Sequence, residues 1–192
     1  MSMQPDLTNG RPLSGTLNPG QNVVILKYKR KTAGNITVNH FEVGGSTQLY
    51  TPSGATSPSA ETYVGTEKLG LSENLTNKEA DIANFEYVST DVTGAPSATS
   101  PSATGDTTVT YKSAPQTVTY RYRRKNAGDV IVHQYEQGTN RPLVTDITLN
   151  GTNKLGLPYN TNNLSIPNYT LVAMPSNQNG IFAVGTQHVY YT

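Results

Sequence analysis

Short alternations of hydrophobic and polar residues run along the chain and predict β-strands. In residues 118–123, Val and Tyr alternate with Thr and Arg, a period of two that places neighbouring side chains on opposite faces of a strand. Residues 130–135 alternate in the same way, and both segments are rich in the β-branched and Tyr residues that strands favour. Turn-forming Asn-Gly and Asn-Pro-Gly sequences separate such runs. The pattern predicts an all-β or β-rich chain.

One segment departs from this alternation. Residues 72–85 combine Glu, Lys and Ala with spaced apolar residues, a composition compatible with a helix. The corresponding residues 158–167 contain two prolines with several Asn and Thr residues, which disfavour a regular helix. We therefore expect a short turn or one helical turn in each segment.

The chain contains an internal repeat. Residues 24–42 and 118–136 are identical at eight of nineteen positions, and residues 65–71 and 151–157 at six of seven. A closing strand at 189–191 also matches residues 118–120 and 24–26. Similar segments that return in a fixed order indicate tandem modules.

This repeat predicts three parts of the chain. Residues 1–33 form an N-terminal tail made of the last strands of a preceding module, residues 34–125 form a first module with loop insertions, and residues 126–192 form a second module that is truncated at its C-terminal end. The junctions at residues 32–33 and 126–127 are short. We therefore expect the modules to stack end to end into an elongated rod.

Two insertions distinguish the first module from the second. Residues 51–60 and 94–105 are rich in Pro, Ser, Thr and Ala and have no counterpart in the second module. Such segments bury too little apolar surface to offset the entropy of ordering. We expect protruding and mobile surface loops there.

Composition restricts the kind of protein and its partners. The chain has no Cys, which excludes disulfides and zinc–thiolate sites, and its net charge of +1 argues against a nucleic-acid partner. No apolar run reaches the roughly 18 residues of a membrane span, so we expect no membrane insertion by this fragment. No signal peptide is visible and the chain stops inside a predicted strand, so we interpret it as a piece of a longer protein.

Candidate catalytic chemistry is sparse. His40, His133 and His188 are spread over three predicted strands, and we expect them to face solvent instead of binding a metal. Carboxylate pairs lie near predicted loops without a signature of sugar hydrolysis, and there is no phosphate-binding Gly-rich loop. We therefore expect no enzyme activity, no cofactor and no metal.

Four segments of the second module together carry a family pattern. They are Asp129–Glu136, Ile166–Val172, Gly180–Phe182 and Val189–Tyr191. In order and spacing they resemble the mucin-binding-protein (MucBP) repeats of Gram-positive bacterial surface proteins. The resemblance extends more loosely over residues 34–125. It implies an extracellular, cell-wall-anchored protein with a β or β-grasp-like fold, with its anchor outside this fragment, and modules that in some cases bind mucin glycans. We expect the fragment to be a monomer.

A row of cations is the candidate ligand site. Alternation places Lys27 and Lys29 on one strand face of the first copy, and Arg121 and Arg123 on one face of the second. Guanidinium groups bind carboxylates and sulfates through paired hydrogen bonds, and neighbouring Tyr rings offer surfaces for sugar stacking. We predict a site for mucin or other glycans at Lys27, Lys29, Tyr120, Arg121, Tyr122 and Arg123. The alternative is that these cations only discourage edge-to-edge pairing of strands.

Two functions remain open at this point. The chain is an adhesin module that binds mucin or other host glycans, or it is a spacer that displays a distal adhesive domain. The first function needs an exposed site, whereas the second needs only stiffness. A covalent isopeptide crosslink from Lys68 or Lys154 to an Asn or Asp is a further open possibility.

Overall fold

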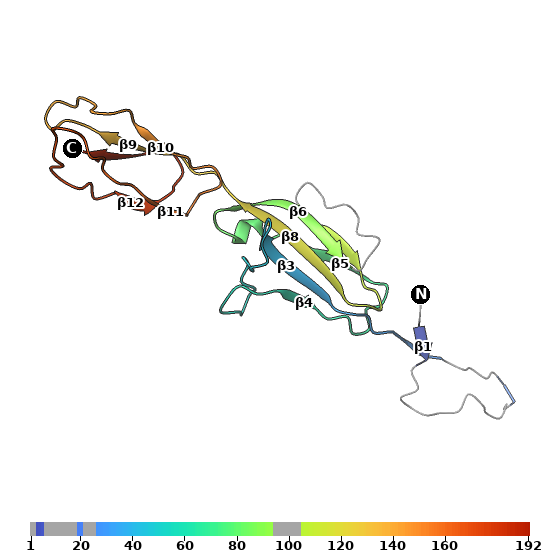
Figure 1. Cartoon of the computed structure of the whole chain (residues 1–192). Helices are drawn as coiled ribbons and strands as arrows, with labels where there is room; N and C mark the ends of the chain where they lie inside the picture. The colour runs from blue at the N-terminus through green and yellow to red at the C-terminus, as the bar shows by residue number, and fades with distance from the viewer. Residues whose placement is uncertain (1–2, 6–18, 21–25, 94–104) are drawn as a thin grey trace. The chain divides into compact units, whose positions relative to one another are not determined.

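The computed structural model describes residues 3–5, 19–20, 26–93 and 105–192, and these residues are nearly all-β (Figure 1). The prediction of a β-rich chain is therefore confirmed. The strands in chain order are β1 (Met3–Pro5), β2 (Tyr28–Arg30), β3 (Ile36–Glu42), β4 (Glu61–Tyr63), β5 (Ser72–Leu75), β6 (Phe85–Thr93), β7 (Thr107–Thr110), β8 (Gln116–Arg124), β9 (Val130–Gln134), β10 (Ile147–Leu149), β11 (Pro158–Asn160), β12 (Asn179–Ile181) and β13 (Gln187–Tyr191).

The segment that was compatible with a helix contains one helical turn. Residues Glu79–Asp81 form a short 3-10 turn, whereas Ser72–Leu75 form β5 and pair antiparallel with β7. The counterpart segment 158–167 begins with the strand β11 and has no helix. The expectation of one helical turn is confirmed at residues 79–81, whereas residues 72–75 form a strand, on which Leu75 is buried.

The chain divides into two compact units, residues 1–81 with 87–121 and residues 82–86 with 122–192. The first unit holds most of a four-stranded sheet with the order β4-β3-β8-β6, together with the pair β5-β7. Alternate residues of β3 and β8 are buried, so that Ile36, Val38, Val118 and Tyr120 form the core face. The period of two in the sequence thus corresponds to one buried and one outer face.

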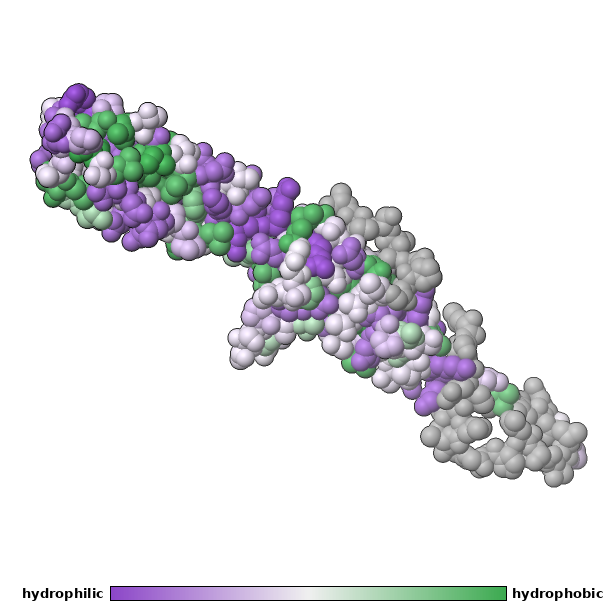
Figure 2. All heavy atoms as spheres, in the orientation of Figure 1, coloured by the Kyte–Doolittle hydropathy of each residue, from purple (hydrophilic) through white to green (hydrophobic). Residues whose placement is uncertain are grey.

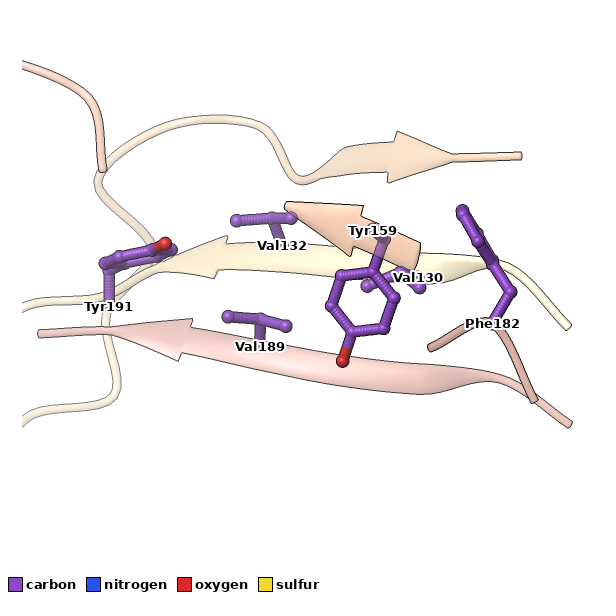
Figure 3. Packing of buried hydrophobic residues seen from close by; sticks show 6 residues of the cluster. All are labelled: Val130, Val132, Tyr159, Phe182, Val189 and Tyr191. Carbon is purple, nitrogen blue, oxygen red and sulfur yellow. The ribbon is translucent and has the colours of Figure 1, made fainter. Parts of the chain in front are cut away.

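The second unit has a three-stranded sheet with the order β10-β9-β13 and the pair β11-β12. β9 pairs antiparallel with β10 and parallel with β13. Figure 3 shows the core on one face of β9 and β13, where apolar side chains gather beneath the rings of Tyr159 and Phe182. These two rings meet edge to face at 5.5 Å, an arrangement that aromatic pairs prefer.

The Gly-Thr-x-Lys-Leu-Gly-Leu segments form the same turn in both copies. In the first, Ala33 N donates to Gly65 O at 2.8 Å and Gly65 N donates to the Asn35 side chain at 3.1 Å. In the second, Ala127 N donates to Gly151 O at 2.9 Å and Gly151 N donates to the Asp129 side chain at 2.9 Å. The sequence repeat is therefore a repeated hydrogen-bond arrangement.

The glycines that precede this turn in the two copies, Gly34 and Gly128, have no room for a side chain. A Cβ atom at Gly34 would lie 2.4 Å from the carbonyl carbon of Ala114, and one at Gly128 would lie 2.0 Å from Gly185 O. Both contacts are to backbone, which cannot move aside as a flexible side chain can. The repeated Ala-Gly pair therefore marks a place where two backbone segments touch in each copy.

The expectation that the histidines face solvent is wrong for His40 and His133, which are buried. His40 follows Ile36 and Val38 at spacings of two, so the strand places it on the core face. Its Nε2 lies 3.1 Å from a Glu61 carboxylate oxygen, and its ring stacks on Tyr120 at 5.2 Å. His188 is exposed, as expected.

The insertions and boundaries are described only in part. Residues 51–60 are mostly exposed and contain turns, whereas residues 94–104 lie outside the described residues. In the N-terminal tail, β1 pairs antiparallel with β2. The mobility of the loops, the module boundaries and the end-to-end stacking stay predictions.

Because the backbone segments lie so close at Gly34, we expect one added methyl group there to lower the stability of the fold markedly. We expect Gly34→Ala to lower the free energy of unfolding by about 1–3 kcal/mol, because the backbone around Ala114 must shift. Gly45→Ala is the matched control, since its nearest contact would be an ordinary 3.5 Å, and we expect a change within about 0.5 kcal/mol. Urea unfolding followed by circular dichroism measures both, and equal costs would contradict the argument.

Burial of His40 predicts a pH-dependent stability. Desolvation lowers the pKa of His40 and outweighs the opposing effect of Glu61, while Lys78 lowers the pKa further. Well above about pH 6.5, His40 is neutral in both the folded and the unfolded chain, and the free energy of unfolding is at its highest with respect to this residue. As the pH falls below this value the unfolded chain binds the proton first, so the free energy of unfolding decreases until the folded pKa is passed.

The variant His40→Gln isolates this effect, because Gln134 is the buried counterpart of His40 in the second copy. Between pH 7.5 and 5, unfolding free energies of the natural chain should fall relative to those of the variant, by at most about 1.4 kcal/mol per pH unit for one proton. Urea titrations at several pH values measure the difference. If the unfolding free energies of the natural chain and the variant change with pH in parallel, burial of His40 does not oppose its protonation in the folded chain, and the argument is contradicted.

Candidate functional site

The predicted tyrosines lie in the core. Tyr120 and Tyr122 are fully buried, because they share the inner face of β8 with Val118. The Tyr120 hydroxyl donates to Leu75 O at 3.0 Å, which satisfies a polar group that would otherwise be costly to bury. The structure therefore places these two rings away from any ligand at the surface.

The predicted cations lie at the surface, and three of them pair with acids. Arg121 Nε lies 3.5 Å from Asp91, Arg123 Nε pairs with Glu86, and Lys29 Nζ lies 3.6 Å from Glu67. Arg121 also donates to the Gly45 carbonyl at 2.6 Å. Lys27 is exposed. Among the described residues, no direct contact joins the lysines of the first copy to the arginines of the second.

A group of aromatic rings covers the outer face of the β9–β13 pair in the second unit. His133 stacks on Tyr190 at 4.5 Å and on His188 at 5.2 Å, and Tyr135 lies 5.4 Å from His133. The parallel register places Tyr190 opposite His133, while Val189 and Tyr191 point into the core. We call these four residues, His133, Tyr135, His188 and Tyr190, the aromatic face.

Hydrogen bonds fix the rings of the aromatic face. His133 Nδ1 lies 2.8 Å from the Asp146 carboxylate, and His133 Nε2 lies 2.9 Å from His188 Nδ1. His133 is buried beneath the others, whereas His188 and Tyr190 are exposed and the Asp146 side chain is 42% exposed. A shallow hollow lined by Tyr135 and residues 142–146 borders the rings. The surface thus combines fixed ring planes with a reachable carboxylate.

The sequence contained a signal for the aromatic face that the prediction missed. Alternation in β13 places His188 and Tyr190 opposite to the core residues, so exposed rings follow from the period of two. They lie beside His133 and Tyr135 only because β13 pairs parallel with β9, a strand far away in the chain. The counterparts in the first copy are Asn39, Phe41, Thr117 and Thr119, which include a single ring.

A second hollow of the same unit is a cleft of about 290 Å³ beside residues 168–172. Its rim carries Glu136, whose carboxylate accepts from Arg141 Nε at 3.0 Å, and Tyr169, whose hydroxyl accepts from the same guanidinium. The Arg141 and Thr139 hydrogen bonds lower the pKa of Glu136, so that its carboxylate is charged at neutral pH. The wall of the cleft is mixed, with apolar residues such as Leu164 and Ile166 beside polar ones such as Gln134 and Asn168, and it carries one ion pair at its edge.

Three other features were considered among the described residues: a metal site, a membrane-spanning helix and an isopeptide crosslink. In the ranges that the structure describes, no three His, Asp or Glu side chains gather to hold a metal ion, and no helix is long and apolar enough to cross a membrane. Lys68 Nζ lies 3.1 Å from the Glu73 carboxylate and 3.1 Å from the Tyr111 hydroxyl. Lys154 Nζ lies over the Phe182 ring at 5.2 Å. These contacts give the isopeptide hypothesis no Asn or Asp partner.

Comparison with known proteins agrees with the repeat. The MucBP domain family matches residues 35–123 and again residues 129–192, which together are most of the chain. Internalin J of Listeria monocytogenes serotype 4b (strain F2365) is 36% identical over 85 residues. That similarity covers 44% of this chain and 9% of Internalin J, so the chain spans a small part of its relative's length. The resemblance read from the sequence is confirmed, and the chain belongs to the MucBP domain family.

Proposed function

We propose that this chain is an adhesive segment of an extracellular, cell-wall-anchored bacterial surface protein, in which MucBP modules bind mucin or related host glycans and catalyse no reaction. The two family matches support this class of function. The aromatic face of the second unit is the single observation that carries the proposal, because it is the kind of surface on which a sugar ring can lie.

The aromatic face suits a sugar for physical reasons. A sugar presents an apolar C–H face and a rim of hydroxyls, so it fits an apolar ring plane with polar groups at the edge. Tyr190 and His188 supply exposed rings, and Asp146 supplies a hydrogen-bond acceptor beside them. Stacking on His133 already fixes the rings, which reduces the entropy lost on binding.

The cations belong to the same proposal as contacts for acidic or sulfated sugars. Arg121 and Arg123 make ion pairs at the surface, and such pairs contribute only about 0–1 kcal/mol. An anionic ligand can therefore replace Asp91 or Glu86 at low cost. Each contact is weak and screened by salt, so we expect useful affinity to come from several modules acting together.

The spacer is the second candidate function, and the repeated turn favours it. The backbone contacts at Gly34 and Gly128 tie the ends of strands together in both copies, which stiffens each unit. A spacer would need these contacts but no exposed ring surface. Mucin binding by the isolated chain therefore decides between the two functions.

Removal of the exposed rings tests the adhesin function. We expect the double variant His188→Ala and Tyr190→Ala to bind immobilised mucin at least about tenfold more weakly, a loss of about 1.4 kcal/mol. The matched control is Thr117→Ala with Thr119→Ala, which changes the counterpart positions of β8 and should bind as the natural chain does. Surface plasmon resonance measures binding and circular dichroism checks the fold. Equal binding by both double variants would remove the aromatic face from the proposal.

The arginines are tested through the salt dependence of binding. We expect Arg121→Ser with Arg123→Ser to keep the fold and to lose the part of mucin binding that decreases between low and high salt. The measurement is the mucin affinity at a series of NaCl concentrations, with Lys125→Ser as a control for loss of charge. If the double arginine variant shows the same salt dependence as the natural chain, the arginines do not bind mucin and only discourage edge-to-edge pairing of strands. Absence of binding by the natural chain at every salt would favour the spacer.

A further inference from the structure

The strand that pairs with β9 carries a bulge beside the aromatic face. Ile147 pairs with Val132, and further along Pro142 pairs with Tyr135. Tyr135 lies three positions after Val132, whereas Ile147 lies five positions after Pro142, so the second strand has two extra residues. Bulges are frequent beside active sites, because they change the direction in which side chains point.

The contacts on either side locate the two extra residues. Leu143 N donates to Gln134 O at 2.8 Å, so these two residues still lie opposite each other. On the other side, Asp146 contacts His133 at 2.8 Å. The bulge therefore consists of residues 144–145.

The first copy has a longer insertion at the same place. Glu61 pairs with Val38, and Gln48 pairs with Phe41. Glu61 lies thirteen positions after Gln48, whereas Phe41 lies three positions after Val38, so this strand has ten extra residues. The short bulge beside stacked rings is therefore a feature of the second copy.

The bulge forms the wall of the shallow hollow that borders the aromatic face. This hollow has a volume of about 400 Å³ and is lined by Tyr135 and residues 142–146. Pro, Leu and Val at residues 142–144 make one part of its wall apolar, and Thr145 and Asp146 make the other part polar. Figure 2 shows that apolar atoms reach the surface of this unit among polar ones on the face in view. Apolar walls with a few polar groups are typical of sites for small ligands.

We propose that this hollow binds the acetamido group of a 2-acetamido sugar whose ring lies on the aromatic face. The proposal rests on the adhesin function and deepens it, since it names the class of sugar that the same site takes. An acetamido group carries one N–H donor, one carbonyl acceptor and one methyl group. The hollow offers a counterpart to each of these three.

The polar part of the wall suits the amide of the acetamido group. Asp146 Oδ1 contacts His133 Nδ1 at 2.8 Å, which holds the carboxylate in place, and the Asp146 side chain is 42% exposed. The sugar N–H can therefore donate to this carboxylate, and hydrogen bonds to a charged acceptor are the stronger kind. The hydroxyl of Thr145, in the same wall, can donate to the acetamido carbonyl.

The apolar part of the wall distinguishes a 2-acetamido sugar from a plain one. A hydroxyl at the same carbon could still donate to Asp146, but it would leave residues 142–144 in contact with water. The acetamido methyl group covers this apolar surface. A single such group changes the affinity of an apolar pocket by about tenfold or more.

Two methyl glycosides that differ only in the group at C2 test the proposal. The natural chain, labelled with ¹⁵N, is titrated with the methyl glycosides of N-acetylgalactosamine and of galactose, and amide signals are followed by NMR. The acetamido sugar should bind at least about tenfold more tightly and should shift the amide signals of residues 143–146. Equal affinities, or no binding of either glycoside, overturn the proposal.

A substitution in the apolar wall tests the assigned place. Val144→Ser should lower the ratio of the two affinities from about tenfold to about threefold or less, because it removes apolar surface from the hollow. Val184→Ser is the matched control, since Val184 is exposed outside this wall, and it should leave the ratio unchanged. Circular dichroism checks the fold of both variants. An unchanged ratio in Val144→Ser overturns the assignment to this hollow.

Failure of this proposal is distinguishable from failure of the adhesin function. If mucin binding depends on His188 and Tyr190 while the two glycosides bind equally, the adhesin function stands and the acetamido subsite is wrong. If the natural chain binds neither mucin nor either glycoside, both proposals are wrong.

Discussion

Both copies of the module depend on a close approach of backbone to backbone at a glycine. Gly34 contacts the chain at Ala114, and Gly128 contacts it at Gly185, at distances where no side chain fits. These contacts allow Ala33 N and Ala127 N to reach the carbonyls of Gly65 and Gly151. Each glycine contact holds the strands before and after it in register. This register separates a core face from an outer face.

The core that this register creates is small and rich in tyrosine. A buried Tyr ring supplies apolar area, but its hydroxyl needs a partner. The structure provides one each time, with Tyr120 donating to Leu75 O and Tyr191 paired with the Thr161 hydroxyl at 2.9 Å. The twelve Tyr residues thus serve the core as well as the surface, and their number alone does not indicate a ligand site.

The two copies keep one frame and differ on their outer faces. Thr117 and Thr119 on β8 correspond to His188 and Tyr190 on β13, so only the second unit carries stacked rings beside a carboxylate. The buried His40 of the first unit corresponds to Gln134 in the second. The two copies thus combine the same close glycine contacts with different outer faces.

The sequence by itself determined the β-rich class, the repeat, the family and the inner face of β8, because these follow from local alternation and from order along the chain. Alternation also placed His40 on the core face, although its polar character led to the expectation of solvent exposure. The ion partners of Arg121 and Arg123 came only from the structure, since Asp91 and Glu86 lie on another strand.

Only the tertiary structure decided which outer faces meet. The aromatic face joins two strands separated by more than fifty residues, and parallel pairing brings His133 beside Tyr190. The cleft beside Tyr169 likewise depends on a hairpin and a loop that are distant in sequence. Local periodicity shows on which face of its own strand each residue lies. The register between strands, however, is set by contacts between residues far apart in the chain, such as those at the glycines.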